Sequence, residues 1–501
     1  MRKRVQLVLA AATLALALAP GAAAVAQAHN SVSPSFAMDH TRMTSAGVTA
    51  PGANYSLFSC QVGLSVGQCY DPYQMRHAYG TDSLIASGFD GRGKTIVIVD
   101  AFQDPNIAAQ LDYFDTFYGL PPVNAGPGTP KFTQVAPDGL GAYDEGWAEE
   151  ITLDVLWAHA MAPGANIVLE LGKDSSDQAL DSALNDAINH NRGDVVSMSF
   201  GESDTCVGTD QTKAWHQSFI NATRKGITLF ASSGDQGALQ PSCDNNSWVK
   251  TPSSPASDPL VTGVGGTELH AADYCLTQLG CDPTQNPAAG SYLSETAWNE
   301  GDPYGDFGNI FGTGTLASGG GFSTVWDEPW YQQGAFHGKQ AGVPDVAYNG
   351  AVLHGVLTYL DLPGMAPDEV GWYRFGGTSA GSPQWAALIA IADQMAHHDL
   401  GFINAGLYLI GQVKPWYAAS FHDVTTGTNS ALEFNSDNTV TDVTGYSARS
   451  GWDAVTGLGT PKAGLGLSYL LRFVTHADGL AAINGSGPHF PGKGHGHYRP
   501  N

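Results

Sequence analysis

One short segment of the sequence has the composition expected around a nucleophilic serine. It reads Phe375-Gly-Gly-Thr-Ser379-Ala-Gly-Ser-Pro383, and an apolar helical run from Gln384 to Met395 follows it. A serine between glycines at the start of a buried helix lies close to other backbone, and the N–H groups of the helix N-terminus can hold an anion. The same residues also suit an ordinary helix cap with glycines that form a turn, so the segment alone supports both interpretations equally.

A serine nucleophile needs a base, and histidine is the usual one. The sequence contains no His-Gly-Thr segment of the kind that opens the histidine-bearing helix of subtilisin-type enzymes. His354-Gly355 lies too close before Ser379 and opens no helical pattern, so we interpret His354 as a loop or edge-strand residue. A carboxylate therefore becomes the candidate base.

Two acidic residues lie four positions apart in a predicted helix that ends at Pro163-Gly164. Glu150 and Asp154 share one face of this helix, one turn apart, beside an apolar stripe. An acidic pair at this spacing is usually just a solvated surface. Trp147 and Trp157 flank the pair and argue against full solvation. The two carboxylates are therefore candidates to face one site.

Asp235 is a further candidate. It lies in the segment Ala231-Ser-Ser-Gly-Asp235-Gln-Gly237, directly after the apolar run 227–231. Open α/β sheets bind their ligands at the carboxyl ends of the strands, which is the predicted position of Asp235. A Gly-Asp-x-Gly segment is also a common turn, and this is the alternative interpretation.

The elements that position these residues follow an alternating pattern from Thr95 onward. Short apolar runs alternate with helical patterns, which is typical of a mainly parallel sheet with helices on both faces. The predicted fold class is therefore α/β. The helical patterns include 178–190 and 212–225, and the predicted buried strands are 95–100, 166–171, 194–199, 227–231 and 260–264.

The composition limits the possible functions. With 22 Lys and Arg against 47 Asp and Glu, the formal net charge is -25 at pH 7. This charge repels nucleic-acid phosphates and anionic lipid surfaces, so we exclude nucleic acid as a partner. The 501 residues can bury a large core, and 62 glycines with only 14% charged residues favour a compact extracellular enzyme. We expect a monomer.

The first residues have the pattern of a secretory signal. Basic residues at 2–4 precede an apolar run from Val5 to Ala19, and Ala26-Gln27-Ala28 forms a small-x-small cleavage site. A membrane anchor is the alternative, but the apolar run is short and Pro20-Gly21 follows it. We therefore predict that residues 1–28 are removed and that the mature protein is secreted, extracellular and not bound to a membrane.

Six cysteines, an even number in a chain predicted to be exported, favour disulfides over metal ligation. Their spacings do not resemble a zinc site, and six cysteines can pair in many ways. Closeness in sequence favours pairing Cys60 with Cys69, Cys206 with Cys243, and Cys275 with Cys281.

The motifs together, in their order, resemble the serine-carboxyl peptidases of the sedolisin and kumamolisin family. The similarity extends over about residues 69–475 and includes segments 73–80, 264–267, 318–321, 344–345 and 377–380. It implies a single large subtilisin-like domain and a secreted endopeptidase that acts on proteins or peptides. By this resemblance, Glu150 is the general base, Asp154 its acidic partner, Ser379 the nucleophile and Asp235 the acid of the oxyanion hole.

Carboxyl groups in these roles favour catalysis at low pH. A histidine with its ordinary pKa of about 6.5 is protonated in acid, whereas a glutamate near about 4.3 still accepts a proton. Asp154 can share a proton with Glu150, so the two would titrate as a unit. Asp235 can donate a hydrogen bond to an oxyanion only while it is protonated. We expect maximal peptide hydrolysis at about pH 3 to 5.

A second site is implied near the C-terminus. Phe421-His-Asp423-Val424 and Arg449-Ser-Gly451-Trp-Asp453 resemble the family's calcium site. The resemblance implies that Asp423 and Asp453 give carboxylates, and that Val424, Arg449 and Gly451 give carbonyl oxygens, to one structural Ca2+, which prefers hard oxygen ligands. Position 449 is often glycine in the family and is arginine here. A plain Asp-Gly turn is the alternative.

The expected domain organisation has four parts. A signal peptide (1–28) precedes an irregular N-terminal extension or short propeptide (29–68), structure begins near Tyr70, the sedolisin-like domain covers 69–475, and a Gly/Pro/His-rich tail (476–501) is disordered. Family members usually carry a long folded prosegment, so the extension is the largest departure from the family. It is either a shortened propeptide removed by self-cleavage or a segment retained through a Cys60–Cys69 disulfide.

Two other functions stay open at this point. One is a conventional subtilisin-type Ser-His-Asp endopeptidase, which the absence of His-Gly-Thr disfavours. The other is an inactive, calcium-stabilised secreted binding protein on the same fold. The complete set of Glu150, Asp154, Asp235 and Ser379 disfavours this second alternative.

Overall fold

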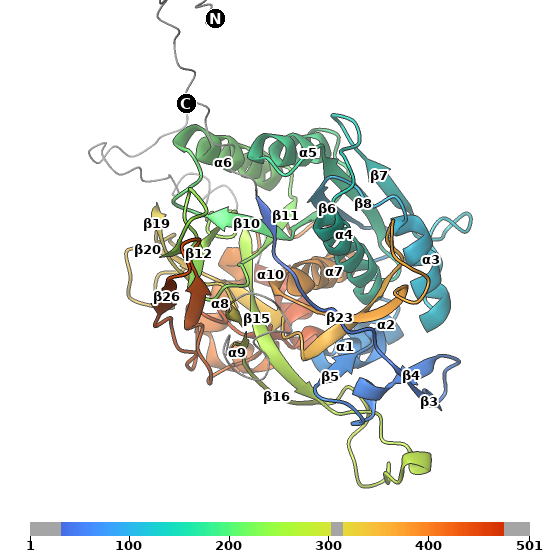
Figure 1. The fold of residues 1–501 in the computed structure, drawn as a ribbon. Coiled ribbons are helices and arrows are strands. Elements are labelled where there is room, and N and C mark those ends of the chain that lie inside the picture. Colours follow the sequence, from blue (N-terminus) through green and yellow to red (C-terminus); the bar gives the residue numbers. More distant parts are fainter. Residues whose placement is uncertain (1–31, 302–313, 475–501) are drawn as a thin grey trace, which may run out of the picture.

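The computed structural model describes residues 32–301 and 314–474 (Figure 1). The predictions for the signal peptide 1–28 and the tail 476–501 concern residues outside these ranges. Within the described ranges, every helix is too short or too polar to cross a membrane.

A sheet of eight strands forms the centre of the molecule, in the order β16-β15-β11-β9-β6-β8-β7, with β21 also paired to β15. All neighbours are parallel except β15 and β16. The strands are β6 Thr95–Ala101, β7 Phe132–Val135, β8 Asn166–Gly172, β9 Val195–Met198, β11 Thr228–Ser232, β15 Thr262–Ala271, β16 Tyr292–Ala297 and β21 Val346–Asn349.

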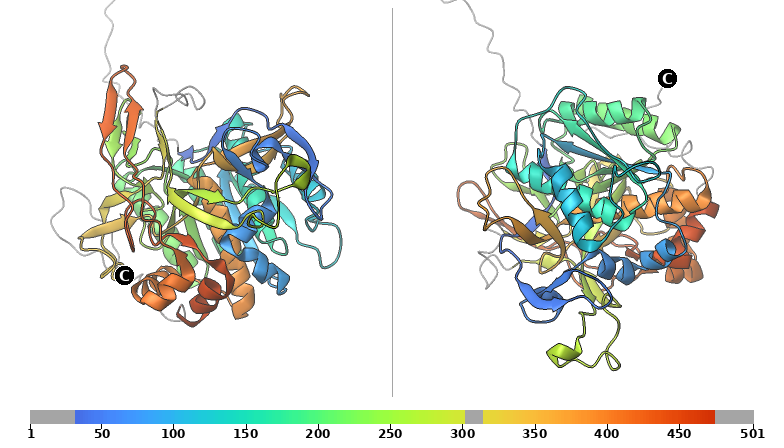
Figure 2. Two further views of the ribbon diagram at one scale, coloured as in Figure 1. Left: turned by 90° about the horizontal axis from the view of Figure 1, so that it is seen from below. Right: turned by 90° about the vertical axis from the view of Figure 1, so that its right-hand side faces the viewer.

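Helices cover both faces of this sheet (Figures 1 and 2). On one face α4 (Glu145–Met161) packs against α7 (Thr378–Ala396), and on the other α5 (Asp177–Asn189) packs against α6 (Thr209–Arg224). Because both faces are covered, six of the seven residues of β6 are buried, which explains why the strands read as continuous apolar runs. The predicted α/β class, with a mainly parallel sheet between two helical layers, is confirmed.

Four of the five predicted strands match β6, β8, β9 and β11 to within one residue at each end. The fifth prediction, 260–264, is wrong in length, because β15 extends to Ala271. In the sequence, the two glycines Gly265 and Gly266 suggest that the strand ends before them. In the fold they allow close packing, since a Cβ on Gly266 would lie 2.6 Å from a ring carbon of Trp298.

The expectation of irregular structure before about Tyr70 is also wrong. Three strands that begin within the extension pair with distant parts of the chain: β1 with β10, β2 with β23 and β5 with β22. These strands have two or three residues each, too few for a periodic pattern to show in the sequence. The elements are β1 Ser33–Pro34, β2 Ala37–Asp39, β3 Ser45–Thr49, β4 Ser56–Phe58, β5 Gln68–Tyr70, β10 Phe200–Ser203, β22 His354–Leu360 and β23 Gly371–Gly376.

A second sheet, in the order β2-β23-β22-β5, leads directly into the predicted nucleophile segment. His354 begins β22, which lies between two other strands. The interpretation of His354 as a loop or edge-strand residue is therefore wrong.

The remaining elements are short and lie around the central sheet. The helices are α1 Pro72–Tyr79, α2 Thr81–Ala86, α3 Ile107–Tyr118, α8 Asn404–Gln412, α9 Lys414–Ser420 and α10 Ser468–Val474. The strands are β12 Leu239–Pro241, β13 Trp248–Lys250, β14 Ser253–Ser254, β17 Asn299–Glu300, β18 Leu316–Ala317, β19 Gly321–Asp327, β20 Gln340–Val343, β24 Phe421–His422, β25 Ala431–Phe434, β26 Val440–Val443 and β27 Thr460–Pro461.

Three disulfides join these elements. They link Cys60 to Cys69, Cys206 to Cys243 and Cys275 to Cys281. The pairing expected from closeness in sequence is confirmed.

Candidate active site

Helix α4 carries the predicted acidic pair. The helix begins after Asp144, whose side chain accepts a hydrogen bond from Trp147 N, and it ends at Met161 before Pro163. Glu150 and Asp154 are both 0% exposed. The solvated-face alternative is therefore wrong, because the sheet and α7 cover the face that carries the pair.

Helix α7 carries Ser379 near its start. Gly377 is the N-cap with φ 90, a left-handed conformation that favours glycine. The N-cap makes no side-chain hydrogen bond, so the cap interpretation of this segment does not hold. The Ser379 hydroxyl donates to Oε2 of Glu150 at 3.1 Å and lies 3.2 Å from the carbonyl oxygen of Ser199. In the described part of the chain, no histidine hydrogen-bonds this hydroxyl.

Asp235 lies directly beyond β11 and contacts the residue before the serine. Its Oδ1 accepts hydrogen bonds from the backbone N–H and the hydroxyl of Thr378, both at 2.8 Å. Its Oδ2 is buried and accepts no hydrogen bond. A Cβ on Gly377 would lie 2.5 Å from this Oδ2, so glycine is required there to leave the oxygen free. Burial raises the pKa of Asp235 to about 7.

The buried carboxyl groups of Glu150, Asp154 and Asp100 interact electrostatically. Burial raises the pKa of Glu150 well above its ordinary value, and the nearby charges of Asp154 and Asp100 raise it further. Burial likewise raises the pKa of Asp154 to about 7. Such a group of carboxyls holds protons in common and titrates as a unit.

Asp100 is a member of this group that the sequence reasoning missed. It lies in β6, is 0% exposed, and its pKa is raised well above the ordinary value by burial and by the charge of Asp154. The available signal was its position near the carboxyl end of a predicted buried strand, where ligand sites of open α/β sheets lie.

The predicted calcium ligands come together in one loop region. Asp423 accepts hydrogen bonds from the Ser450 hydroxyl at 2.8 Å and from Gly451 N at 3.0 Å. Asp453 accepts one from Arg449 N at 2.9 Å. The two carboxylates therefore flank the same three-residue turn, although 26 positions separate Asp423 from Arg449 at its start.

This loop fits a hard cation. It offers two carboxylates, and among the described residues no hydrogen bond is made to the carbonyl oxygens of Val424, Arg449 or Gly451. Oxygen-only ligands of this kind suit Ca2+. Arg449 does not have a left-handed backbone, so the loss of the family's glycine causes no strain at this position.

A different group of possible metal ligands was not expected from the sequence. One ligand atom each of Glu268, His270 and His354 lie within 4.8 Å of one another. The first two belong to β15 and the third to β22. The Nδ1 of His354 is 3.2 Å from Oε1 of Glu268. This group is separate from the loop that contains Asp423 and Asp453.

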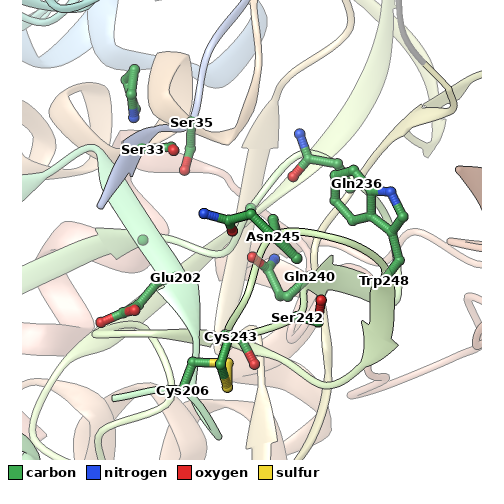
Figure 3. Close-up of a pocket in the computed structure, with 15 residues that line it drawn as sticks. Ser33, Ser35, Glu202, Cys206, Gln236, Gln240, Ser242, Cys243, Asn245 and Trp248 are labelled. Carbon is green, nitrogen blue, oxygen red and sulfur yellow. A yellow bond between two sulfur atoms is a disulfide. The ribbon is translucent and has the colours of Figure 1, made fainter. Parts of the chain in front are cut away.

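A cavity of about 190 Å³ opens beside the catalytic candidates (Figure 3). Figure 3 shows Ser33 and Ser35 at one end and the disulfide between Cys206 and Cys243 at the other. Most of its other side chains are polar. Its remaining lining residues are Pro34, Gly201, Glu202, Ser203, Gly234, Gln236, Gln240, Pro241, Ser242, Asn245 and Trp248.

Comparison with known proteins gives a consistent family assignment. Residues 144–404 match the model of the subtilase family. Kumamolisin from Bacillus sp. (strain MN-32) is 28% identical over 406 residues, which cover 78% of this chain and 62% of kumamolisin. Sedolisin from Pseudomonas sp. (strain 101) is 30% identical over 294 residues, which cover 57% of this chain and 42% of sedolisin. The chain thus spans less than two thirds of the length of these curated relatives.

A solved structure has the same fold. It is Pseudomonas sedolisin, described as a serine-carboxyl proteinase, in complex with two molecules of pseudo-iodotyrostatin. The TM-score is 0.63 at 25% sequence identity, and the match covers 82% of this chain and 99% of that one. The predicted subtilisin-like architecture is therefore confirmed.

Proposed function

Because this chain belongs to the subtilase family and resembles kumamolisin and sedolisin, as its motifs predicted, we propose that it is a secreted serine-carboxyl endopeptidase that hydrolyses proteins or peptides at acidic pH. The observation that carries this proposal is the 3.1 Å hydrogen bond from the Ser379 hydroxyl to Oε2 of Glu150. It pairs a nucleophile with a base in the geometry required for proton transfer.

In the proposed reaction, Ser379 Oγ attacks the carbonyl carbon of the substrate while Glu150 accepts the hydroxyl proton. Glu150 then gives this proton to the leaving amine, and a water molecule hydrolyses the acyl-enzyme by the same route. Asp154 shares the proton held by the carboxyl pair and so keeps one negative charge available on Glu150. The Ser379 N–H and a protonated Asp235 Oδ2 donate hydrogen bonds to the oxyanion.

The acidic working range follows from Asp235. With a pKa raised to about 7 by burial, the group is protonated in mild acid and can donate from Oδ2. Above that pH it becomes an anion facing a developing anion, and the rate falls. At lower pH, protonation of the shared carboxyl group removes the base. The limit set by Asp235 therefore supports a higher rate in acid than at neutral pH.

The loop at Asp423 and Asp453 is proposed to hold one structural Ca2+. Its two carboxylates and the carbonyl oxygens of Val424, Arg449 and Gly451 would hold the ion, which would fix the loop without taking part in the reaction. We further propose that residues 69–475 form the peptidase domain, that the protein is exported with removal of 1–28, and that it acts as a monomer. The three disulfides support an oxidising, extracellular location.

A pH-rate profile with matched variants tests the proposal. Purified protein should hydrolyse casein with a maximum at about pH 3 to 5, and Ser379→Ala should lose this activity. Retained activity in Glu150→Ala would favour the Ser-His-Asp alternative, since a histidine base would not need this residue. Absence of hydrolysis over the whole pH range in a folded protein would favour the inactive binding protein.

A further inference from the structure

A glutamate and two histidines that have no part in the proposed reaction gather where the two sheets meet. Glu268 and His270 lie two positions apart in β15, so their side chains leave the same face of that strand. His354 begins β22 of the second sheet, which packs against β15. One ligand atom of each residue lies within 4.8 Å of the other two. Two different sheets therefore bring three possible metal ligands together.

The distances within this group match those between ligands of one metal ion. Oε1 of Glu268 is 3.3 Å from Nε2 of His270 and 3.2 Å from Nδ1 of His354. Zinc binds imidazole nitrogen and carboxylate oxygen at about 2.0–2.2 Å, so two ligands of a tetrahedral ion lie about 3.3 Å apart. The two nitrogens are within 4.8 Å of each other, and the side chain of His270 is 40% exposed. A small rotation of this exposed ring would complete the site.

The three groups are close, yet they do not hydrogen-bond to one another. Among the described residues, neither imidazole forms a hydrogen bond with Glu268, although both nitrogens are within 3.3 Å of its Oε1. In the part of the chain that the structure covers, Nδ1 of His354 is buried without a hydrogen-bond partner. A buried polar atom of this kind calls for an explanation, and a bound ion is one. A hydrogen-bonded pair aligns its N–H with the oxygen, whereas ligands of one ion are aligned with the ion between them.

A buried asparagine holds the two strands in this arrangement. Oδ1 of Asn349 accepts a hydrogen bond from Leu269 N at 3.0 Å, and its Nδ2 donates to the carbonyl oxygen of His354 at 2.7 Å. Leu269 lies between Glu268 and His270 in β15, so one side chain fixes the backbone at all three candidate ligands. Asn349 is 1% exposed. Supporting hydrogen bonds of this kind hold the ligands of metal sites in position.

The charges around the group are compatible with a bound cation. Arg374 donates to the carbonyl oxygen of Leu353, next to His354, but it also forms a buried ion pair with Asp39, which balances its charge. Glu300 accepts hydrogen bonds from the backbone on the other side, including Leu353 N at 2.6 Å. The group therefore has no unbalanced positive charge beside it among these neighbours.

We propose that Glu268, His270 and His354 bind one Zn2+ ion, which links β15 of the central sheet to β22 of the second sheet. Imidazole nitrogens favour a transition-metal ion such as zinc, whereas the oxygen-only loop at Asp423 suits Ca2+. Three protein ligands leave a fourth position for water. Because β22 pairs with β23, which leads into the Ser379 segment, the ion stabilises the sheet that precedes this segment. The inference does not depend on the proposed peptidase function.

Titration of the full-length protein with Zn2+ tests this site. The parent protein carries Ser379→Ala to prevent self-digestion, and excess Ca2+ fills the proposed calcium loop. The tail histidines are replaced by glutamine so that they do not bind metal; they are His476, His489, His495 and His497. Calorimetry at about pH 7.5, where imidazole is mostly neutral, should then show one Zn2+ per chain. Absence of zinc binding would overturn the proposal and leave the group as plain ion pairs.

Two variants of the parent protein assign the bound ion to this group. Glu268→Gln and His270→Gln should each weaken Zn2+ binding by more than about tenfold, since loss of an outer-shell partner alone costs about 10- to 100-fold. Both side chains are partly exposed, so the variants should fold. His190→Gln is the matched control, because His190 pairs with Asp186 but belongs to no group of three possible ligands among the described residues. Unchanged binding in the two variants, or an equal loss in His190→Gln, would overturn the assignment.

Thermal melts measure the link between the sheets. Excess Zn2+ should raise the melting temperature of the parent protein by about 2 °C or more, and Glu268→Gln should abolish this rise. Additional Ca2+ should give no such rise once the Asp423 loop is filled. An equal rise with Ca2+ would contradict the choice of zinc.

X-ray absorption of the zinc-loaded parent protein identifies the atoms that hold the ion. The spectrum should show two imidazole nitrogens at about 2.0–2.1 Å from the metal. His270→Gln should lose one of them. A shell made of oxygen atoms alone would place the ion at another group of carboxylates and would refute the proposed site.

Discussion

The Ser379 hydroxyl and the Glu150 carboxylate meet at 3.1 Å although 229 positions separate them in the sequence. Helices α4 and α7 pack against each other on one face of the sheet and bring the two residues together. Both side chains are fully buried, so solvent does not weaken the contact. This contact pairs the candidate nucleophile with the candidate base.

Glu150→Gln should lower kcat/KM for a peptide substrate by about 10²- to 10⁴-fold, because the amide keeps the size of the side chain but cannot accept a proton. The melting temperature should not fall, since the change removes one of several buried carboxyls that repel one another. Glu149→Gln, the adjacent position, is the matched control and should keep nearly full activity. Equal losses in the two variants would show that Glu150 has no special role.

Asp235→Asn should change the pH dependence of the rate rather than abolish it. The amide oxygen can accept the bonds from Thr378 that Oδ1 now accepts, and the NH2 group can donate from the position of Oδ2 at every pH. The fall in rate near the pKa of about 7 should therefore weaken, and the ratio of rates at neutral and acid pH should rise. Asp235→Ala should lose about 10²- to 10³-fold at all pH values. An unchanged profile in the Asn variant would exclude Asp235 as the donor.

The folded protein should be more stable in acid than at neutral pH. Burial raises the pKa of Asp345 and Glu300 to about 7 and of Glu433 to about 8. A carboxyl whose pKa is higher folded than unfolded stabilises fully below its unfolded value, and this stability is lost as the pH rises through the folded value. His354 and His422 oppose the trend, because burial lowers their pKa values to about 4 and about 3.

The carboxyls with raised pKa outnumber these histidines, so the melting temperature should fall by about 5 °C or more between pH 4 and pH 8. Calorimetry of Ser379→Ala measures this without self-digestion. A melting temperature that rises over the same range would contradict the prediction and would mean that the histidines dominate.

Removal of calcium should lower the melting temperature. An ion present at 100 times its dissociation constant stabilises the folded state by about 2.7 kcal/mol, which a thermal melt with and without chelator detects. Asp423→Asn and Asp453→Asn should each abolish the difference. Glu268→Gln is the control, because Glu268 belongs to the other group of possible ligands. Loss of the calcium effect in Glu268→Gln alone would move the site to that group.

Local patterns made a large part of the fold predictable. Strand β6 is buried on both faces, so its sequence is an apolar run. A helix repeats every 3.6 residues, so Glu150 and Asp154, four positions apart, lie on one face of α4. The glycine before Ser379 is visible in the sequence because the backbone of Gly377 is left-handed, which favours glycine at this position. Patterns of this kind depend on neighbours within a few residues, so a sequence displays them directly.

The sequence by itself determined the α/β class, the acidic pair, the serine segment and the family resemblance, since side-chain types and their spacing carry these features. Only the tertiary structure decided that Asp100 joins the acidic pair and that Ser35 lies against Ser379. The Ser35 contact is made by backbone N–H and carbonyl groups, which every residue except proline offers alike. A pairing between groups common to all residues leaves no pattern in the sequence, and long-range packing alone selects it.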